Sequence, residues 1–428
     1  MDASRKQSRV DAIGMMACLV IALGLRLAVI AIRPHELVLD RDAYLGIAIG
    51  VAEGRGYSSP GSLVATAFRP PLYPLFLGAG LACFTPSVVV GGINIIAGLL
   101  TVWLTARLGT CLNFGPMRFL AALIVAIDPL LVWYSCQPMT ESICALLATF
   151  WLWTVMSLPP GNRHEDYTKR ILNGLSFGLL VLCRPTFWLI AVLYPLFWFT
   201  PLKRQDVEKP QSRSIPFLPG WAWTLISTFC VVGPWLIRNW IVFGVPILTT
   251  THGGYTLLLG NNPVFYQEVV EQPWGTVWQH DSLLNWQMEL ESKIQNDIGL
   301  QASEVQRDRW YSNQAKQFII ATPRLFAAAV LHRVRSLWNI VPQGEVTAQT
   351  GGWAMTAVGW FYSLILTAAC VGLVTVACRS DRNLWLPFFV LIASVQLAHL
   401  FYWTNTRMRA PLTPAIALLA IMAIPRKL

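Results

Sequence analysis

Residues 10–32 read VDAIGMMACLVIALGLRLAVIAI, an apolar run that is long enough to cross a membrane as one helix. Arg5, Lys6 and Arg9 precede this run, as basic residues precede the apolar part of a secretory signal peptide. The apolar part of a signal peptide, however, has only about 7–15 residues. We therefore predict an uncleaved first transmembrane helix.

The composition of the whole chain agrees with a membrane protein. Of the 428 residues, 55% are hydrophobic and 13% are charged, whereas soluble domains average about 25% charged residues. The net charge is +10, but no basic stripe with interleaved aromatic residues is present, so we expect no nucleic-acid partner. The nine cysteines form no CxxC pair and no Cys/His cluster. We therefore expect no metal ion and no cofactor.

Nine further apolar runs follow the first one. They predict an all-α polytopic membrane protein with about ten transmembrane helices and external juxtamembrane helices. The ten predicted spans are 10–32, 87–106, 119–135, 142–158, 171–183, 186–200, 219–237, 353–378, 384–403 and 411–424. Residues 71–84 are short and rich in proline, so we predict an interfacial or re-entrant helix there.

The basic residues predict how these spans are oriented in the membrane. With the N-terminus inside, sixteen basic residues fall on inner segments and seven on short outer segments. The inner set is Arg5, Lys6, Arg9, Arg107, Arg118, Arg163, Lys169, Arg170, Lys203, Arg204, Lys209, Arg213, Arg379, Arg382, Arg426 and Lys427. The outer set is Arg33, Arg41, Arg55, Arg69, Arg184, Arg407 and Arg409. Because cytoplasmic loops carry the excess of Lys and Arg, we predict a multi-pass protein of the inner (cytoplasmic) membrane with both termini in the cytoplasm.

This direction places two long segments of one membrane domain, residues 1–428, on the external face. The first external loop covers 33–70. The second covers 238–352, where turn signals such as Gly253-Gly254 are followed by apolar residues at helical spacing. Such amphipathic stretches are typical of interfacial helices on the bilayer surface.

Two carboxylates in the first external loop are candidates for catalysis. Asp40 and Asp42 follow the first span closely, where partial burial can adjust the pKa of a general base. A simpler interpretation is that one of them caps a helix, because aspartate often accepts the backbone N–H groups of a first helical turn. The spacing alone leaves both interpretations open.

Several stretches share their order along the chain with one enzyme family. They are Asp40 to Tyr44, Glu53-Gly54-Arg55-Gly56-Tyr57, Arg69-Pro70-Pro71-Leu72-Tyr73-Pro74, Tyr134-Ser135 to Thr140-Glu141, Cys183-Arg184-Pro185-Thr186, Pro234-Trp235 to Arg238-Asn239, Gly260-Asn261-Asn262-Pro263 and Arg407-Met408-Arg409-Ala410-Pro411. Together they resemble the GT-C glycosyltransferases of family 39, the bacterial relatives of protein O-mannosyltransferases and lipid A aminoarabinose transferases. Met408 and Ala410 depart from the bulkier residues that are usual there.

The resemblance implies a GT-C-type fold and an enzyme that moves a sugar from a polyprenyl-phosphate carrier to an acceptor on the external, periplasmic face. In this family an aspartate deprotonates the acceptor, and the anomeric configuration is inverted. Asp40 matches that aspartate by its spacing, and Asp42 shares or replaces the role. Which of the two is the base stays open.

The resemblance also implies which residues bind the substrates. Arg69 holds the position where the family binds the donor phosphate, and Arg238 and Arg407 are further cations on the outer face. For each arginine the alternative is snorkelling to lipid headgroups. The substrate-binding candidates are Tyr44, Tyr73, Glu141, Asn261 and Asn262. For Glu141, an interaction with the helix dipole is the alternative. Because arginine can neutralise a leaving phosphate, no metal ion is required.

The implied partners are a polyprenyl-phosphate sugar, membrane lipids and an acceptor whose class, a lipid, a glycan or a protein, stays open. A different class of function is a transporter or flippase that moves lipid-linked sugars without catalysis. Transporters often contain inverted repeats and broken helices at the centre of the membrane. Here no repeat is visible and the polar residues concentrate in outer loops, which favours the enzyme.

Overall fold

The computed structural model describes residues 2–157, 167–198, 220–343 and 352–425. In these ranges the chain forms α-helices joined by short 3₁₀ and π turns, and its β pairing is an isolated bridge between Ser58 and Ala65. The predicted all-α class is therefore confirmed. Several basic residues of the charge pattern lie outside the described ranges, namely Arg163, Lys203, Arg204, Lys209, Arg213, Arg426 and Lys427.

Four of the described helices contain a stretch that is long and apolar enough to cross a membrane. These helices are α1 (Asp2–Ile32), α4 (Pro86–Cys111), α10 (Gly220–Phe243) and α17 (Gly352–Ala377). Each coincides with a predicted span. They confirm that the chain is a multi-pass membrane protein.

The predicted span 119–135 is broken into two helices. Helix α5 (Arg118–Ile127) follows the turn η2 (Gly115–Met117), and α6 (Pro129–Trp133) runs into η3 (Tyr134–Cys136). The two halves are bent by 47° and count as a fifth span if they cross together. The break falls at Asp128 because the residue before a proline avoids the helical region and a proline donates no hydrogen bond.

The other apolar helices are shorter. They are α3 (Leu72–Leu81), α7 (Glu141–Met156), α8 (Tyr167–Cys183), α9 (Trp188–Trp198), α18 (Leu386–Ala398) and α19 (Thr413–Ile421). The turns η4 (Pro185–Phe187) and η6 (Arg382–Trp385) lead into α9 and α18. A full crossing takes about 20 helical residues. Helix length therefore does not confirm the predicted number of ten spans.

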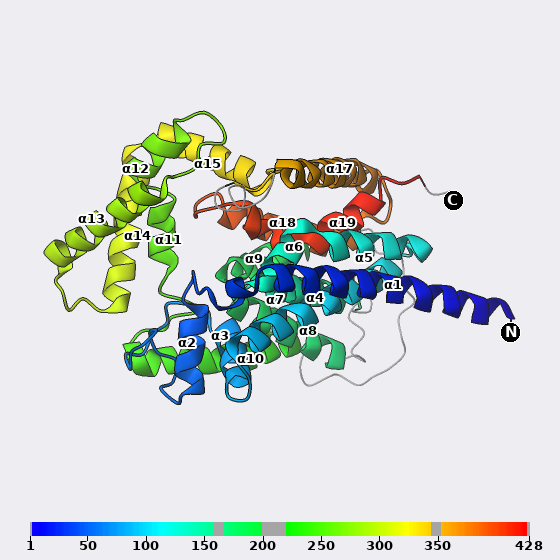
Figure 1. The fold of residues 1–428 in the computed structure, drawn as a ribbon, viewed down its shortest axis with the longest axis horizontal. Coiled ribbons are helices and arrows are strands. Elements are labelled where there is room, and N and C mark those ends of the chain that lie inside the picture. Colours follow the sequence, from blue (N-terminus) through cyan, green and yellow to red (C-terminus); the bar gives the residue numbers. More distant parts are fainter. Residues whose placement is uncertain (1, 158–166, 199–219, 344–351, 426–428) are drawn as a thin grey trace.

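The apolar helices pack into one bundle. Helix α8 lies along α10, α4 along α7, and α17 along α19. The bundle interior contains fully buried apolar side chains such as Leu108, Leu152 and Phe388. The start of α1 and the end of α19 lie at the same end of the bundle, opposite to α11 and α14 (Figure 1).

The second segment that is predicted to be external forms a small helical unit with a core of its own. Its elements are α11 (Gly253–Leu259), α12 (Pro263–Phe265), η5 (Tyr266–Val270), α13 (His280–Ile298), α14 (Glu304–Ala321) and α15 (Pro323–Leu337). Phe265, Trp278 and Trp286 lie in its apolar core. These helices therefore pack on one another (Figure 1), which the prediction of interfacial helices did not include.

The first external loop lies against this unit. It contains η1 (Pro34–Val38) and α2 (Tyr44–Ala52). The carboxylate of Glu304, at the start of α14, accepts hydrogen bonds from Thr66 Oγ1 at 2.9 Å and from the backbone N–H of Ala67 at 3.0 Å. The same carboxylate accepts a bond from the Thr251 hydroxyl. The two external segments are thus joined at one carboxylate.

Candidate active site

The side chain of Asp42 lies between two arginines. Its Oδ1 is 3.1 Å from Arg69 Nη2, and its Oδ2 is 3.1 Å from Arg407 Nη1. Arg69 Nε also donates a hydrogen bond to the backbone carbonyl of Asp42 at 2.7 Å. Arg407 belongs to the turn η7 (Thr406–Leu412) just before α19. The fold therefore brings a residue from the end of the chain to the first external loop.

Two further residues extend this arrangement into a chain of ion pairs. Glu141, the first residue of α7, is 1% exposed, and its Oε1 lies 2.6 Å from Arg184 Nη2 and 3.9 Å from Arg407 Nε. We call the sequence of contacts Arg69–Asp42–Arg407–Glu141–Arg184 the ion-pair chain. It holds three cations and two anions. This excess of positive charge suits the binding of an anion such as a phosphate.

The charges in the ion-pair chain act on each other strongly. Burial alone would raise the pKa of the Asp42 carboxyl, but the charges of Arg407 and Arg69 outweigh burial and hold this pKa below its usual range. Burial likewise opposes the charge on Arg407, and the carboxylates of Asp42 and Glu141 raise its pKa above the ordinary value. Asp42 and Arg407 are therefore both ionised near neutral pH.

Asp40 has a different environment from Asp42. Its Oδ2 accepts the backbone N–H of Gly46 in the first turn of α2 at 2.7 Å, so the helix-capping interpretation holds for this oxygen. Its Oδ1 is buried and has no hydrogen-bond partner in the described part of the chain. Between the two aspartates and α2, Ala43 has φ 62°. Residues other than glycine seldom adopt this left-handed conformation, which is most often found where function requires it.

The tyrosines predicted to bind substrate lie beside the aspartates. The rings of Tyr44 and Tyr73 meet edge to face with their centroids 5.5 Å apart, and the Arg69 guanidinium lies 5.2 Å from the centroid of Tyr44. Tyr73 is fully buried, and burial, together with the charges of Glu141 and Asp40, raises the pKa of its phenol well above the usual value. Asp40, Tyr73 and the ion-pair chain therefore belong to one polar site.

Four buried polar atoms of this site lack a hydrogen-bond partner among the described residues. They are Asp40 Oδ1, Tyr73 OH, Glu141 Oε2 and Arg407 Nε. Buried polar groups in proteins are nearly always hydrogen-bonded, so each exception requires an explanation. A polar ligand that enters the site would satisfy these atoms. The site thus offers hydrogen-bond donors, acceptors and an excess of positive charge in one place.

Arg238, predicted to bind the donor phosphate, instead donates its hydrogen bonds to backbone carbonyls of the first external loop. Its Nη1 donates to the carbonyl of Thr66 at 2.8 Å, and its Nη2 donates to the carbonyl of Tyr57 at 2.9 Å. Its guanidinium also lies 5.1 Å from the ring centroid of Trp235. The structure therefore gives Arg238 the role of fastening α10 to the first external loop, and the phosphate-binding prediction has no geometric support at this position.

The two asparagines predicted to bind substrate are also structural. Asn261 is completely buried and accepts bonds from Tyr266 OH at 2.9 Å and from Arg333 Nη2 at 3.0 Å. Asn262 caps α12, because its Oδ1 accepts the backbone N–H of Phe265 at 2.8 Å. Both side chains hold the external helices together. The predicted turn is present around them, but their side chains point into the fold and not toward a substrate.

Two residues of the site region were not among the predicted site residues. Arg184 was noted only as part of an Arg-Pro-Thr stretch, although its position at an outer helix end was the available signal. The other residue is His252, whose ring packs on Phe68 with centroids 4.3 Å apart, beside Arg69. Nothing local in the sequence indicates this contact.

In the part of the chain that the structure describes, no group of three or more His, Cys, Asp or Glu side chains is placed to hold a metal ion. The metal-independent reaction remains a prediction.

The chain shares its fold with a solved membrane oligosaccharyltransferase, which is the predicted GT-C-type fold. The solved structure of the apo oligosaccharyltransferase from Archaeoglobus fulgidus matches with a TM-score of 0.50 and 13% identity, over 95% of this chain and 50% of that chain. The structure of the same protein tethered with an acceptor peptide containing the NVT sequon also matches with a TM-score of 0.50 and 13% identity. The match covers 96% of this chain and 49% of that chain. This chain therefore spans about half the length of that oligosaccharyltransferase.

A third solved structure is ArnT from Cupriavidus metallidurans bound to undecaprenyl phosphate, with a TM-score of 0.44 and 13% identity over 95% of this chain and 77% of that chain. No protein-family model and no curated protein sequence matches this chain. At 13% identity the likeness to the oligosaccharyltransferase concerns the fold. The predicted GT-C-type fold is confirmed at that level.

Proposed function

We propose that this protein is a membrane glycosyltransferase that moves a sugar from a polyprenyl-phosphate donor to an acceptor on the external face of the inner membrane. The observation that carries the proposal is the pair of arginines on Asp42, next to an Asp40 oxygen with no partner. A phosphate-binding group and a proton acceptor are the two groups that this transfer requires. The GT-C fold supports the proposal as a likeness of architecture.

Arg69 and Arg407 bind the donor phosphate in this proposal. Asp42 fixes both guanidinium groups, so little rearrangement is needed when the phosphate arrives. Negative charge grows on the phosphate as the bond to the sugar breaks, and preorganised cations stabilise that charge more in the transition state than in the bound donor. Arg184 and Glu141 hold Arg407 from the other side.

Asp40 is the general base in this proposal, and Asp42 is not. Both oxygens of Asp42 are engaged by arginines and its pKa is lowered, which makes it a weak proton acceptor. Asp40 is oriented through one oxygen by Gly46, while the other oxygen is free to accept a proton. Asp40 is also the residue that the family resemblance favours, and its unpartnered oxygen is a geometric reason for the same assignment.

The transfer then proceeds in one displacement. Asp40 Oδ1 takes the proton of the acceptor hydroxyl while the hydroxyl oxygen forms a bond to the anomeric carbon of the sugar. The bond from that carbon to the phosphate oxygen breaks, and its electron pair leaves with the polyprenyl phosphate, which Arg69 and Arg407 neutralise. Attack opposite the leaving phosphate inverts the anomeric configuration.

The experiment that tests the proposal is transfer by the purified protein in lipid nanodiscs. Radiolabelled undecaprenyl-phosphate sugars are offered with an extract of envelope lipids and glycans, and labelled products are separated from the donor. The expected result is a product that forms with the wild-type protein and fails to form with an Arg69→Ala, Arg407→Ala double variant. If the protein forms no product, but moves the donor across the bilayer of sealed proteoliposomes, the proposal is overturned in favour of a flippase.

A further inference from the structure

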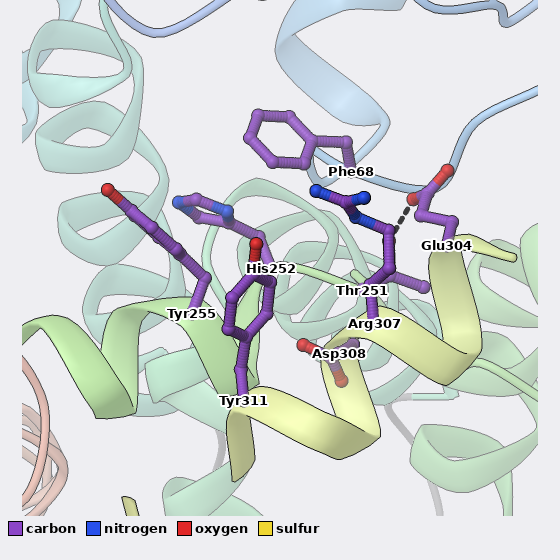
Figure 2. A pocket seen from close by; sticks show the side chains of 8 residues that line it. All are labelled: Phe68, Thr251, His252, Tyr255, Glu304, Arg307, Asp308 and Tyr311. Carbon is purple, nitrogen blue, oxygen red and sulfur yellow. Dashed lines mark hydrogen bonds between the residues drawn. The ribbon is translucent and has the colours of Figure 1, made fainter. Parts of the chain in front are cut away.

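A pocket lies beside the ion-pair chain, where the first external loop meets α11 and α14. It is open on one side, and its volume is about 220 Å³. Figure 2 shows Phe68, Tyr255 and Tyr311 around it, with Asp308 on the α14 side. Pockets for drug-sized ligands measure about 300–1,000 Å³. This pocket therefore has room for one small ring rather than for a peptide or a lipid chain.

Aromatic rings form much of the pocket wall. His252 packs on Phe68 with centroids 4.3 Å apart and on Tyr255 at 5.1 Å, and Tyr255 meets Tyr311 edge to face at 5.5 Å. These contacts hold each ring in place before a ligand arrives. Fixed aromatic rings present flat apolar surfaces at low entropic cost. Such surfaces suit the C–H faces of a sugar ring.

The polar groups of the pocket offer hydrogen-bond acceptors to a ligand. Asp308 uses Oδ1 for the backbone N–H of Gly254 at 2.6 Å, which leaves Oδ2 for a ligand. The Nδ1 atom of His252 is buried and has no partner among the described residues. Arg307, the lining arginine, is paired with Glu291. Hydroxyl groups match such acceptors, whereas a negatively charged ligand would be repelled.

The pocket borders the site where the donor phosphate is proposed to bind. Phe68 is the chain neighbour of Arg69, whose Nη2 reaches Asp42. Burial and the charge of Arg69 lower the pKa of His252 to about 3. His252 is therefore neutral at physiological pH and can accept a hydrogen bond from a hydroxyl. A ring in the pocket would sit next to both the phosphate and the proposed base.

We infer that this pocket binds one sugar ring without negative charge, and that it is the sugar-recognition subsite of the transferase. The inference rests on the proposed function for the identity of its ligand. Two sources share this chemistry, the sugar of the lipid-linked donor and a sugar of a glycan acceptor. The site selects a ring by stacking and hydroxyl contacts, and it excludes uronic acids.

Binding of monosaccharides tests the subsite without any need for turnover. The protein is placed in nanodiscs or in a detergent without a sugar headgroup. Saturation-transfer NMR then measures methyl α-mannoside, methyl β-glucoside and methyl β-galactoside against methyl glucuronide. We expect at least one neutral glycoside to bind and the glucuronide to fail. Stronger binding of the glucuronide, or no binding of any neutral glycoside, would overturn the inference.

Matched variants assign the binding to the pocket. Tyr311→Ala removes one aromatic wall, and Trp274→Ala removes an aromatic side chain of the same external unit that does not line the pocket. We expect Tyr311→Ala to weaken glycoside binding about fivefold or more, and Trp274→Ala to leave it unchanged. Asp308→Asn, with Asp281→Asn as its control, tests the acceptor group. Equal binding by Tyr311→Ala and wild type, with both proteins folded by thermal melt, would contradict the assignment.

Kinetics separates the two sources of the ring. If the ring belongs to the donor, Tyr311→Ala raises the KM of the lipid-linked sugar, and if it belongs to the acceptor, it raises the KM of the acceptor. Unchanged KM values for both would overturn the inference. Glycoside binding by the wild-type protein without any sugar transfer would refute the proposed function and leave the subsite standing.

Discussion

Asp42 and Arg407 are 365 residues apart in the chain, and their side chains meet with Asp42 Oδ2 3.1 Å from Arg407 Nη1. This contact joins the first external loop to the turn before the last helix. The same Asp42 carboxylate binds Arg69 through its other oxygen. One acidic side chain therefore fixes two arginines whose proposed ligand is the donor phosphate.

Replacing Arg407 by alanine should abolish most of the transfer activity. The variant loses a cation that faces the leaving phosphate, and losing one such preorganised donor typically costs about 10²–10³-fold in turnover. The measurement is initial rate against donor concentration, where we expect a lower kcat and a higher KM for the donor. Arg379→Ala is the control because this arginine pairs with Asp381 outside the site. Equal losses in both variants would argue against a role in phosphate binding.

Replacing Arg238 by alanine should affect stability rather than chemistry. Its guanidinium holds the carbonyls of Thr66 and Tyr57, and buried acceptors left unpaired cost about 1–3 kcal/mol each. We expect a lower melting temperature and a kcat within about threefold of wild type, per folded molecule. A large loss of kcat at unchanged melting temperature would restore the earlier prediction that Arg238 binds the phosphate.

Gly254 should not tolerate alanine. A Cβ built there would lie 2.0 Å from the backbone carbonyl oxygen of Asp308 in α14, so α11 and α14 would have to separate. Overpacking of this kind typically costs about 1–3 kcal/mol. Gly253→Ala is the matched control, because a Cβ there meets nothing within 4 Å. Thermal melts of the two variants are compared, and equal melting temperatures would contradict the observed helix packing.

The stability of the external unit should depend on the protonation of Asp308. Burial raises the pKa of this carboxyl from 3.8 to about 6. The folded state then binds more protons than the unfolded state between these values, so stability falls as pH rises through this range. Asp308→Asn removes the effect while its amide oxygen still accepts the Gly254 N–H. We expect the variant to melt about 2–5 °C above wild type at pH 7.

The control for this prediction is the same comparison of melting temperatures at low pH. Near pH 4 the carboxyl is protonated in the folded wild-type protein, so the variant and wild type should melt together. A variant that is less stable than wild type at pH 7 would show that the charged carboxylate is favourable where it lies.

The apolar runs predicted most of the helices because burial in lipid forces the backbone to form its own hydrogen bonds. The predicted spans 10–32 and 353–378 lie almost entirely within the helices α1 and α17. The number of full-length spans was not predictable. Local breakers such as Asp128-Pro129 and short helices such as α9 depend on neighbouring helices, which periodicity does not describe.

The site was predictable in part. The first loop stands out because Asp40 and Asp42 follow the first span closely, and Arg69 because it matches the position where the resembling family binds phosphate. The pairing of Asp42 with Arg407, however, depends on how distant helices pack. Arg238 and Asn261 were assigned to the site because they are polar and external, but their donors and acceptors are used within the fold. Only tertiary structure distinguishes a free polar group from an engaged one.

The central claim is that Asp40 is the base and Asp42 holds the arginines. Asp40→Asn tests it most directly, because the amide oxygen can still accept the Gly46 N–H but cannot take the acceptor proton. Transfer from an undecaprenyl-phosphate sugar is measured alongside donor binding and thermal melting. The account predicts a folded variant that binds donor normally and turns over about 10²–10⁴-fold more slowly, whereas Asp42→Asn also weakens donor binding. Full transfer activity in Asp40→Asn would contradict the account.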